Sequence, residues 1–366
     1  SLVENLNPPR IGPEAVQTPF TTQRNDGITI SIHEANLTNY SSMTLKANGT
    51  KNLECDLVPW SDGTKVYVDG KLRTPWRTII VGDNPAKLAE STLTLNLNEP
   101  NALKGTDWIR PGKYIGLWWE MIGTNESSWG SGTYHGAKTD RVKEYIDFGS
   151  KYGFDGLLVE GWNTGWDENW CCTGDGETFG FYNPHPEYDS KEVHDYAQKK
   201  GIRIVGHHET GTQIENYESQ LDSAFAYCQR NGIRVVKTGY VNDGSQNIKR
   251  IDENGMLQRE WHHGQFMVEH FRKVLEVAAK YEVSLVVHEP IKDTGLRRTF
   301  PNMMSREGAK GQEFNGFMSS KDNNKPNHTT IIPFTRLLSS PMDYTPGIFN
   351  LVDYRYNSPE DRKINP

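Results

Sequence analysis

The sequence predicts an α/β protein in which a β/α barrel of the TIM type follows part of an antiparallel β-sandwich. Residues 1–105 alternate apolar and polar positions in short runs, whereas residues 106–366 alternate apolar strand-like runs with longer helical patterns. Repeated strand-helix units form parallel sheets that close readily into barrels. We therefore expect a sandwich domain over residues 1–105 and a barrel domain over residues 106–366.

The N-terminal strands are predicted from period-two runs that Asn, Gly and Pro separate. These runs are GITISIHEA, SMTLKA, TKVYVDGKL, RTIIVGD and STLTLNL. Turn residues between short alternating runs are typical of antiparallel sheets, so each run is expected to form one strand of the sandwich.

The barrel strands are expected where apolar runs alternate with helical patterns. The strand-like runs cover residues 114–121, 154–160, 202–208, 233–237 and 283–288. The helical patterns cover residues 138–151, 190–200, 213–231 and 264–281. Gly153, Gly201 and Gly232 follow three of these helices, and glycine readily takes the left-handed conformation that ends a helix.

The last barrel units are weaker in the sequence. A sixth strand is predicted near residues 307–313 and a seventh near residues 328–334, in HTTIIPF. An eight-stranded barrel should continue past residue 350, but residues 350–366 are mostly polar. We therefore interpret the chain as a fragment that lacks the last barrel unit and begins late in the sandwich.

Composition excludes several classes of function. The 366 residues carry a net charge of -7 without a run of Lys or Arg, so nucleic acid is not an expected partner. No apolar stretch is long enough to span a bilayer, and the four cysteines indicate neither a zinc ribbon nor a disulfide framework. Ten tryptophans favour a carbohydrate ligand, because sugar rings stack on indole. Nothing in the sequence indicates an oligomeric state.

Glutamates end the apolar runs, at Glu120, Glu160, Glu209, Glu289 and Glu313. The carboxyl ends of barrel strands open onto one face, so these side chains are expected to meet in one pocket. Two carboxylates can split a glycosidic bond, one as the acid and the other as the base or nucleophile. Further carboxylates such as Glu307 favour a calcium ion, which prefers oxygen ligands.

Two His-Glu pairs recur, in RIVGHHE and VVHEP. Neighbouring side chains of a strand face opposite sides, so His207 shares a side with Glu209 while His208 turns away. The first pair is compatible with a zinc site, with hydrogen-bonded core residues, or with a substrate-binding histidine beside a catalytic carboxylate. The acidic segment SREGAKGQEF is compatible with a ligand-binding loop or a solvated loop.

Seven segments together carry a family resemblance. They are GKYIGLWWEM, GFDGLLVEGWNTGW, GHHETG, RVVKTGYV, VVHEP, EGAKGQEF and PFTRLLSSPMDYTPGIF. Over nearly the whole chain, the sequence resembles glycoside hydrolase family 97. The resemblance implies a calcium-dependent, exo-acting α-glycosidase with a β-sandwich, a catalytic barrel and a C-terminal β-domain. It also implies an oligosaccharide or α-glucan substrate and a periplasmic or secreted location.

The resemblance implies a role for each acidic residue. It makes Glu313 the general acid and assigns Glu209 and Glu289 to activating the attacking water. The calcium ligands that it implies are Glu34, Glu289, Glu307 and Glu313. The positions that it assigns to substrate contact are Trp119, Glu160, His207, His208 and His288.

The resemblance also separates two branches of the family. Retaining members carry an Asp nucleophile at the end of the fourth barrel strand, where this chain has Thr238 and Gly239. Neither residue can attack carbon, and glycine leaves room for a water molecule, so an inverting α-glucosidase is expected. The alternatives are a retaining α-galactosidase of the same family and a non-catalytic sugar-binding fragment.

Overall fold

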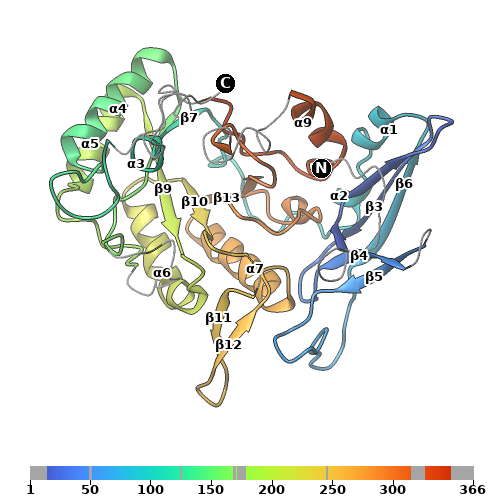
Figure 1. The fold of residues 1–366 in the computed structure, drawn as a ribbon. Coiled ribbons are helices and arrows are strands. Elements are labelled where there is room, and N and C mark those ends of the chain that lie inside the picture. Colours follow the sequence, from blue (N-terminus) through green and yellow to red (C-terminus); the bar gives the residue numbers. More distant parts are fainter. Residues whose placement is uncertain are drawn as a thin grey trace, which may run out of the picture.

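The structure is a computed structural model that describes residues 15–48, 52–123, 126–167, 170, 179–244, 246–314 and 326–347. Figure 1 shows small antiparallel sheets on one side of the molecule and a larger sheet with its helices on the other. Cys55 and Cys228 are free thiols, and Cys171 and Cys172 lie outside the described residues. No helix in the described part of the chain combines the length and the apolar character needed to cross a membrane.

Two three-stranded antiparallel sheets form the N-terminal part. One contains β2 (Phe20–Gln23), β3 (Thr29–Ala35) and β6 (Trp76–Gly82), and the other contains β1 (Ala15–Gln17), β4 (Met43–Asn48) and β5 (Asn52–Leu57). The runs GITISIHEA, SMTLKA and RTIIVGD correspond to β3, β4 and β6, so these three predictions are confirmed.

Two of the predicted N-terminal strands are wrong. TKVYVDGKL forms no strand, and STLTLNL contains the short helix α2 (Leu93–Asn96), which follows α1 (Pro85–Ala89). The Asn96 amide donates to the Thr92 hydroxyl at 2.9 Å, and the Asn98 amide donates to the Thr94 carbonyl at 2.7 Å. Such local side-chain bonds compete with strand pairing and stabilise a helical turn here.

The larger sheet has six parallel strands in the order β14-β13-β10-β9-β8-β7. The strands are β7 (Tyr114–Leu117), β8 (Gly156–Val159), β9 (Arg203–Glu209), β10 (Val235–Gly239), β13 (Ser284–Val287) and β14 (Met303–Arg306). This architecture confirms the predicted TIM-type barrel in its incomplete form. The sixth strand lies at Met303–Arg306, so its prediction at residues 307–313 is wrong.

Helices follow the strands and cover one face of the sheet (Figure 1). They are α3 (Trp119–Ile122) after β7, α4 (Thr139–Tyr152), α5 (Ser190–Lys200), α6 (Ile214–Arg230) and α7 (Gln265–Lys280). The four long helices agree with the predicted ranges. Gly153 and Gly201 end α4 and α5 with φ values of 71° and 73°, the left-handed conformation that the sequence predicted.

The predicted seventh strand is also wrong, because HTTIIPF is helical. It spans α9 (Pro326–Ile331) and the 3-10 helix η3 (Ile332–Phe334). The Thr329 and Thr330 hydroxyls donate to carbonyls three residues earlier, which stabilises a helical turn. Other elements that the sequence did not indicate are the hairpin of β11 (Ile248–Ile251) and β12 (Leu257–Glu260), and η2 (Leu296–Arg298).

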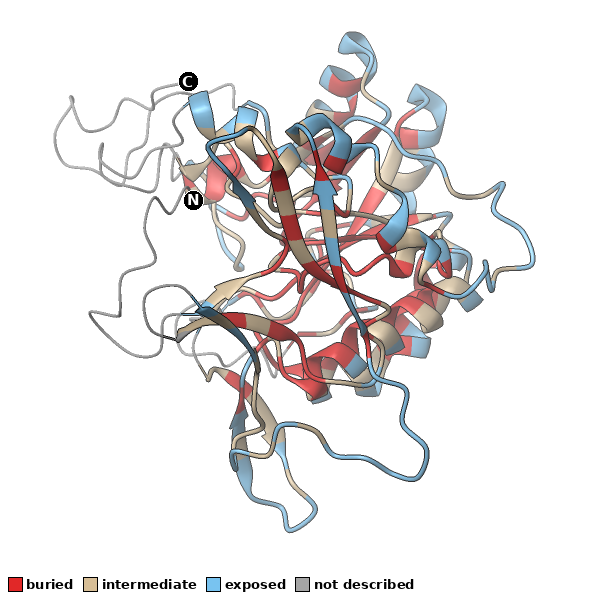
Figure 2. Ribbon diagram, turned by 90° about the vertical axis from the view of Figure 1, so that its right-hand side faces the viewer, coloured by how far each residue is buried: buried red, intermediate tan, exposed pale blue. Residues whose placement is uncertain are grey.

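The strands of the parallel sheet consist largely of buried residues, red in Figure 2, and apolar side chains pack on both faces of the sheet. Its outer face packs against the helices. Its inner face carries a separate cluster to which each strand contributes one residue: Tyr114, Leu158, Val205, Val235, Val286 and Met304. Side chains two positions further along a strand point to the same face. The next inward layer on the four central strands therefore consists of Glu160, His207, Lys237 and His288.

Candidate active site

The candidate site is the layer of polar side chains directly above the inner apolar cluster. Cross-strand pairing sets Glu209 beside Gly239, Thr238 beside Val287, and Val287 beside Arg306. His288 and Glu289 follow Val287, and Glu307 follows Arg306. The structure therefore brings Glu209, Glu289 and Glu307 to neighbouring strand ends, at the carboxyl edge of the sheet.

The backbone after β10 holds two of these carboxylates. Glu209 accepts hydrogen bonds from the N–H groups of Gly211 at 2.8 Å and Val241 at 3.1 Å. Glu289 accepts one from the N–H group of Tyr240 at 2.8 Å. Glu289 itself has a positive φ of 43°, in a region that residues other than glycine seldom occupy. The adjacent residues Tyr240 and Val241 after β10 thus donate one main-chain bond to each carboxylate, and Gly211 after β9 donates a second bond to Glu209.

Burial and mutual repulsion favour the protonated forms of these acids. Burial, followed by the charge of Glu289, raises the pKa of Glu209 to about 8. Burial and the charge of Glu307 raise the pKa values of Glu289 and Glu313 to about 7. Glu313 lies on the loop after β14, and the charges of Glu307 and Glu289 both raise its pKa. The structure therefore brings Glu313 into the same group of carboxylates.

A buried ion pair lies on the opposite side of the layer. Lys237 Nζ lies 3.0 Å from Glu160 Oε1, and Trp129 Nε1 donates to Glu160 Oε2 at 3.0 Å. His207 Nε2 lies 3.7 Å from the same carboxylate. Burial opposes ionisation of Glu160, but Lys237, His207 and the Trp129 N–H together outweigh it and lower the pKa of this carboxyl. The same pair raises the pKa of Lys237 despite its burial.

His288 lies between two acids. Its Nε2 lies 2.6 Å from Asp343 Oδ2, and its Nδ1 lies 3.7 Å from Glu307. The Tyr114 hydroxyl also donates to Asp343, at 2.6 Å. Burial and Lys237 act to lower the pKa of His288, yet Glu307 and Asp343 raise it overall. The imidazole is therefore held in a fixed orientation with both nitrogens toward carboxylates.

Three predicted site residues lie elsewhere or play another part in the fold. His208 faces away from the layer, with Nδ1 2.9 Å from the Tyr217 hydroxyl of α6, and burial lowers its pKa to about 3. Trp119 is buried in α3, directly after β7. Glu34 lies in β3, where its oxygens are 2.8 Å from Lys292 Nζ and 2.6 Å from Arg77. The structure thus pairs Glu34 with two cations.

Two residues of the site were missed by the sequence analysis. Lys237 is the one cation in VVKTGYV, residues 235–241, and a buried lysine in a strand is itself a signal of a paired acid. Asp343 belongs to PMDYTPG and meets His288 from 55 positions away in the chain. No local pattern predicts such a contact.

The residues present fit a divalent cation by their chemistry. Glu289, Glu307 and Glu313 are hard oxygen donors that repel one another in a buried site, and a dication would remove that repulsion. Among the described residues, no three acidic, histidine or cysteine side chains already surround a common point. Binding of an ion would therefore require these carboxylates to draw together.

Comparison with known proteins assigns both parts of the chain to one family. Residues 118–309 match the family described as Glycoside hydrolase 97, and residues 3–100 match Glycosyl-hydrolase 97 N-terminal. A curated retaining alpha-galactosidase of Bacteroides thetaiotaomicron is 25% identical over 351 residues, which are 90% of this chain and 47% of that protein. A probable retaining alpha-galactosidase of Streptomyces bingchenggensis is 29% identical, over 78% of this chain and 38% of that protein.

Solved structures of the same family are more similar. A glycoside hydrolase family 97 enzyme from a Pseudoalteromonas species, in complex with acarbose, is 50% identical with a TM-score of 0.86. The match covers 92% of this chain and 50% of that one. A variant of that enzyme in complex with panose is 49% identical, with the same TM-score of 0.86 and the same coverage. This chain spans about half the length of the relatives that it matches.

Proposed function

The chain belongs to glycoside hydrolase family 97, and we propose that it forms the sandwich and barrel parts of an inverting, calcium-assisted α-glucosidase. The proposed reaction releases glucose from the non-reducing ends of α-glucans. The observation that carries this proposal is the contact between Gly239 and Glu209. At the strand end where a nucleophile would stand, there is no side chain, and a carboxylate occupies the neighbouring space.

The acids divide by their hydrogen bonds. Glu209 and Glu289 accept main-chain N–H bonds, which orient them and favour the ionised form, so they suit the role of base for an attacking water. Burial and mutual repulsion still raise their pKa values to about 8 and about 7, so this role requires the positive charge of a bound dication. Glu313 has a pKa raised to about 7 by burial and by Glu307, so it suits the role of the acid that protonates the leaving oxygen. Water attack opposite the acid inverts the anomeric carbon.

Calcium would be held by Glu289, Glu307 and Glu313. When bound, the ion would supply positive charge that keeps Glu289 and Glu307 ionised and orients hydroxyl groups of the sugar, whereas Glu313 must keep its proton to act as the acid. Glu34 is the fourth ligand proposed from the family resemblance. That assignment requires Glu34 to leave Lys292 and Arg77, which hold it in the structure.

The remaining groups suit recognition of a hexose. Lys237 and Glu160 can bind sugar hydroxyls as a donor and an acceptor, and His207 and His288 lie in the same layer. The rings of Trp129 and Trp166 stack with centroids 6.1 Å apart, next to Glu160 and His207. Glucosides are favoured because the 49%-identical structure holds panose, a trisaccharide of α-linked glucose.

The anomer formed first in the reaction tests this proposal. Proton NMR of maltose hydrolysis should show β-glucose as the initial product, since the α-linkage is inverted. Glu313→Gln should abolish turnover while sugar binding persists, because the amide cannot donate an acidic proton. Retained turnover in this variant would remove Glu313 as the acid. An exported location, periplasmic or secreted, belongs to the same proposal and is tested by cell fractionation.

A second candidate is a retaining α-galactosidase, which the names of the two curated relatives favour. It predicts α-galactose as the first product from an α-galactoside. A third candidate, which the sequence analysis left open, is a non-catalytic sugar-binding fragment. It predicts maltose binding in calorimetry with no glucose released at saturating calcium.

A further inference from the structure

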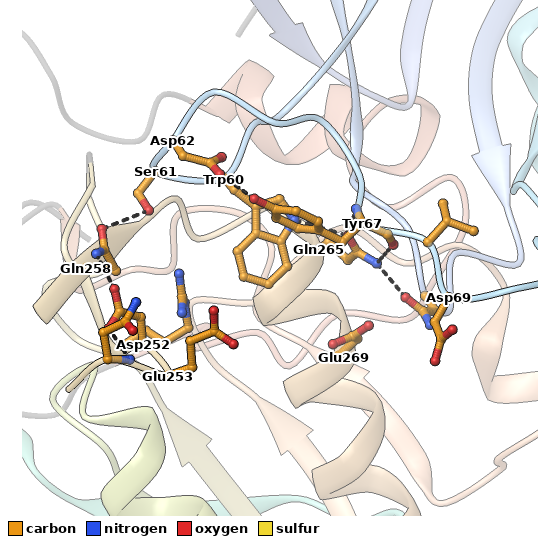
Figure 3. A pocket seen from close by; sticks show the side chains of 14 residues that line it. Trp60, Ser61, Asp62, Tyr67, Asp69, Asp252, Glu253, Gln258, Gln265 and Glu269 are labelled. Atoms are coloured by element: carbon orange, nitrogen blue, oxygen red, sulfur yellow. Dashed lines mark hydrogen bonds between the residues drawn. The ribbon is translucent and has the colours of Figure 1, made fainter. Parts of the chain in front are cut away.

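A second cavity lies outside the group of carboxylates, between the N-terminal part, the β11–β12 hairpin and α7 (Figure 3). Its volume is about 770 Å³, within the range of about 300–1,000 Å³ that is usual for small-molecule sites. None of its lining residues belongs to the candidate active site.

One buried side chain fixes the walls of this cavity. Gln265, the first residue of α7, is only 3% exposed. Its Oε1 accepts hydrogen bonds from Trp60 Nε1 at 3.1 Å and from the Tyr67 N–H at 2.9 Å. Its Nε2 donates to the Tyr67 carbonyl at 2.9 Å and to Asn39 at 2.6 Å. The N-terminal loop is therefore anchored to the barrel helix, and the cavity is preformed.

Aromatic rings and carboxylates line the cavity together. The rings of Trp60 and Tyr67 lie edge to face at 5.3 Å, and Tyr67 is about half exposed, at 53%. The guanidinium group of Arg250 lies 5.1 Å from the centre of the Trp60 ring. Asp69, Glu253 and Glu269 add carboxylates around these rings (Figure 3).

The charge and spacing of these groups restrict the ligand class. An excess of carboxylates disfavours phosphorylated and other anionic ligands. A metal ion would need several oxygens around one point, and no three acidic, His or Cys side chains in the described ranges are placed to hold one. Dispersed acceptors beside aromatic rings instead suit a neutral ligand with many hydroxyl groups, because rings stack on sugar faces while carboxylates accept from hydroxyls.

The cavity also lies close to the candidate active site. His262 lies near the backbone of Glu289, and Gln265 follows three residues later. Three residues span at most about 11 Å. The cavity and the candidate active site therefore lie at the two ends of one short segment of chain. One oligosaccharide, or neighbouring branches of one polymer, could contact both.

We propose that this cavity is a second saccharide-binding site, which binds α-glucan away from the bond that is split. The inference rests on the proposed function for its choice of sugar. The site would keep a polymer attached between successive cleavages, since two linked binding events raise the effective concentration of the chain end.

Calorimetry with maltoheptaose tests the site in the Glu313→Gln background, where turnover should not occur. Adding Asp69→Asn and Glu269→Gln should weaken binding about tenfold or more, because each loses a charged hydrogen-bond acceptor. Tyr67→Ala should weaken it independently by removing a stacking surface. Glu276→Gln, on α7 beyond the cavity, is the matched control and should leave binding unchanged. Equal binding by the cavity variants and the control would overturn the proposal.

Activity separates this proposal from the proposed function. With Glu313 intact, the cavity variants should hydrolyse a small aryl α-glucoside at the unaltered rate while the KM for glycogen rises about tenfold. Loss of aryl glucoside hydrolysis in these variants would overturn the second site, because the cavity would then belong to the active site. Failure of the unsubstituted chain to split the aryl glucoside would count against the proposed function, whereas maltoheptaose binding would still report on the cavity.

Discussion

Gly239 lies against the carboxylate of Glu209 so closely that a β-carbon at position 239 would be only 2.0 Å from Glu209 Oε2. The two residues are direct partners across β10 and β9. Any side chain at this position must displace Glu209, and Glu209 is held by two main-chain N–H groups. The absence of a side chain at this strand end is thus a geometric requirement for the position of the neighbouring acid.

Gly239→Ala should lower kcat by about 100-fold or more, because the methyl group would shift the carboxylate that is proposed to activate water. Steady-state kinetics on an aryl α-glucoside measure the change. Gly244→Ala is a suitable control, because no heavy atom lies within 4 Å of its added β-carbon. Normal kcat in Gly239→Ala would argue against Glu209 as a base.

Lys237→Met should destabilise the fold by about 3–5 kcal/mol, because it leaves the buried Glu160 without its cation. Chemical denaturation measures the free energy of unfolding. The double variant Lys237→Met/Glu160→Gln should recover much of the loss, since no uncompensated charge remains. Equal stability of the single and double variants would show that the ion pair contributes little.

Asp343→Asn should lower the pKa of His288, because it replaces a negative charge 2.6 Å from Nε2 by a neutral amide. NMR titration of the histidine ring measures the pKa directly. Tyr114→Phe, which removes only the other hydrogen bond to Asp343, should shift the pKa of His288 much less. An unchanged pKa in Asp343→Asn would mean that Glu307 alone sets the charge of His288.

Calcium should stabilise the protein more at pH 8 than at pH 5. The folded pKa values of Glu289 and Glu313 lie near 7, above the ordinary value of 4.5, so these acids contribute stability that is present below pH 4.5 and lost as pH rises through 7. Calcium needs ionised ligands such as Glu289, so its binding competes with protons at pH 5 and relieves repulsion at pH 8. Thermal melts with calcium and with chelator measure the difference.

Proton release provides the control for this prediction. Calorimetric titration of calcium at pH 6 in two buffers with different ionisation enthalpies should show protons leaving the protein. Glu289→Gln should abolish both the release and the thermal shift. A calcium effect of equal size at pH 5 and pH 8 would place the ion at another site.

The parallel strands were predictable because each is an apolar run too short for a helix and followed by a helical pattern. The carboxyl-edge rule then placed Glu209 and Glu289 on the same face without further information. Strand predictions were wrong in TKVYVDGKL, STLTLNL, residues 307–313 and HTTIIPF. In STLTLNL and HTTIIPF, side-chain bonds that only local geometry reveals stabilise helical turns instead. Short segments of this kind are decided by such bonds and by tertiary contacts.

The candidate site was predictable in part for a related reason. Strand alternation separates His207 from His208, and the structure indeed turns His208 toward Tyr217. The role of Lys237 was not predicted, because its partner Glu160 lies on a different strand, 77 positions away. The role of Asp343 was not predicted, because it depends on a contact with His288 that the fold forms between distant parts of the chain. Contacts between residues far apart in the chain leave no recognisable pattern in the sequence around either residue.

The left-handed backbone of Glu289 has a thermodynamic corollary. A β-carbon in that conformation costs on the order of 1 kcal/mol that glycine would not incur. Glycine at this position should therefore relax the main chain and, with one buried acid fewer, raise the thermal stability, while it removes a carboxylate that is proposed to activate water. Thermal stability and the proposed catalytic role therefore favour different residues at position 289. Selection for thermal stability alone would favour loss of Glu289.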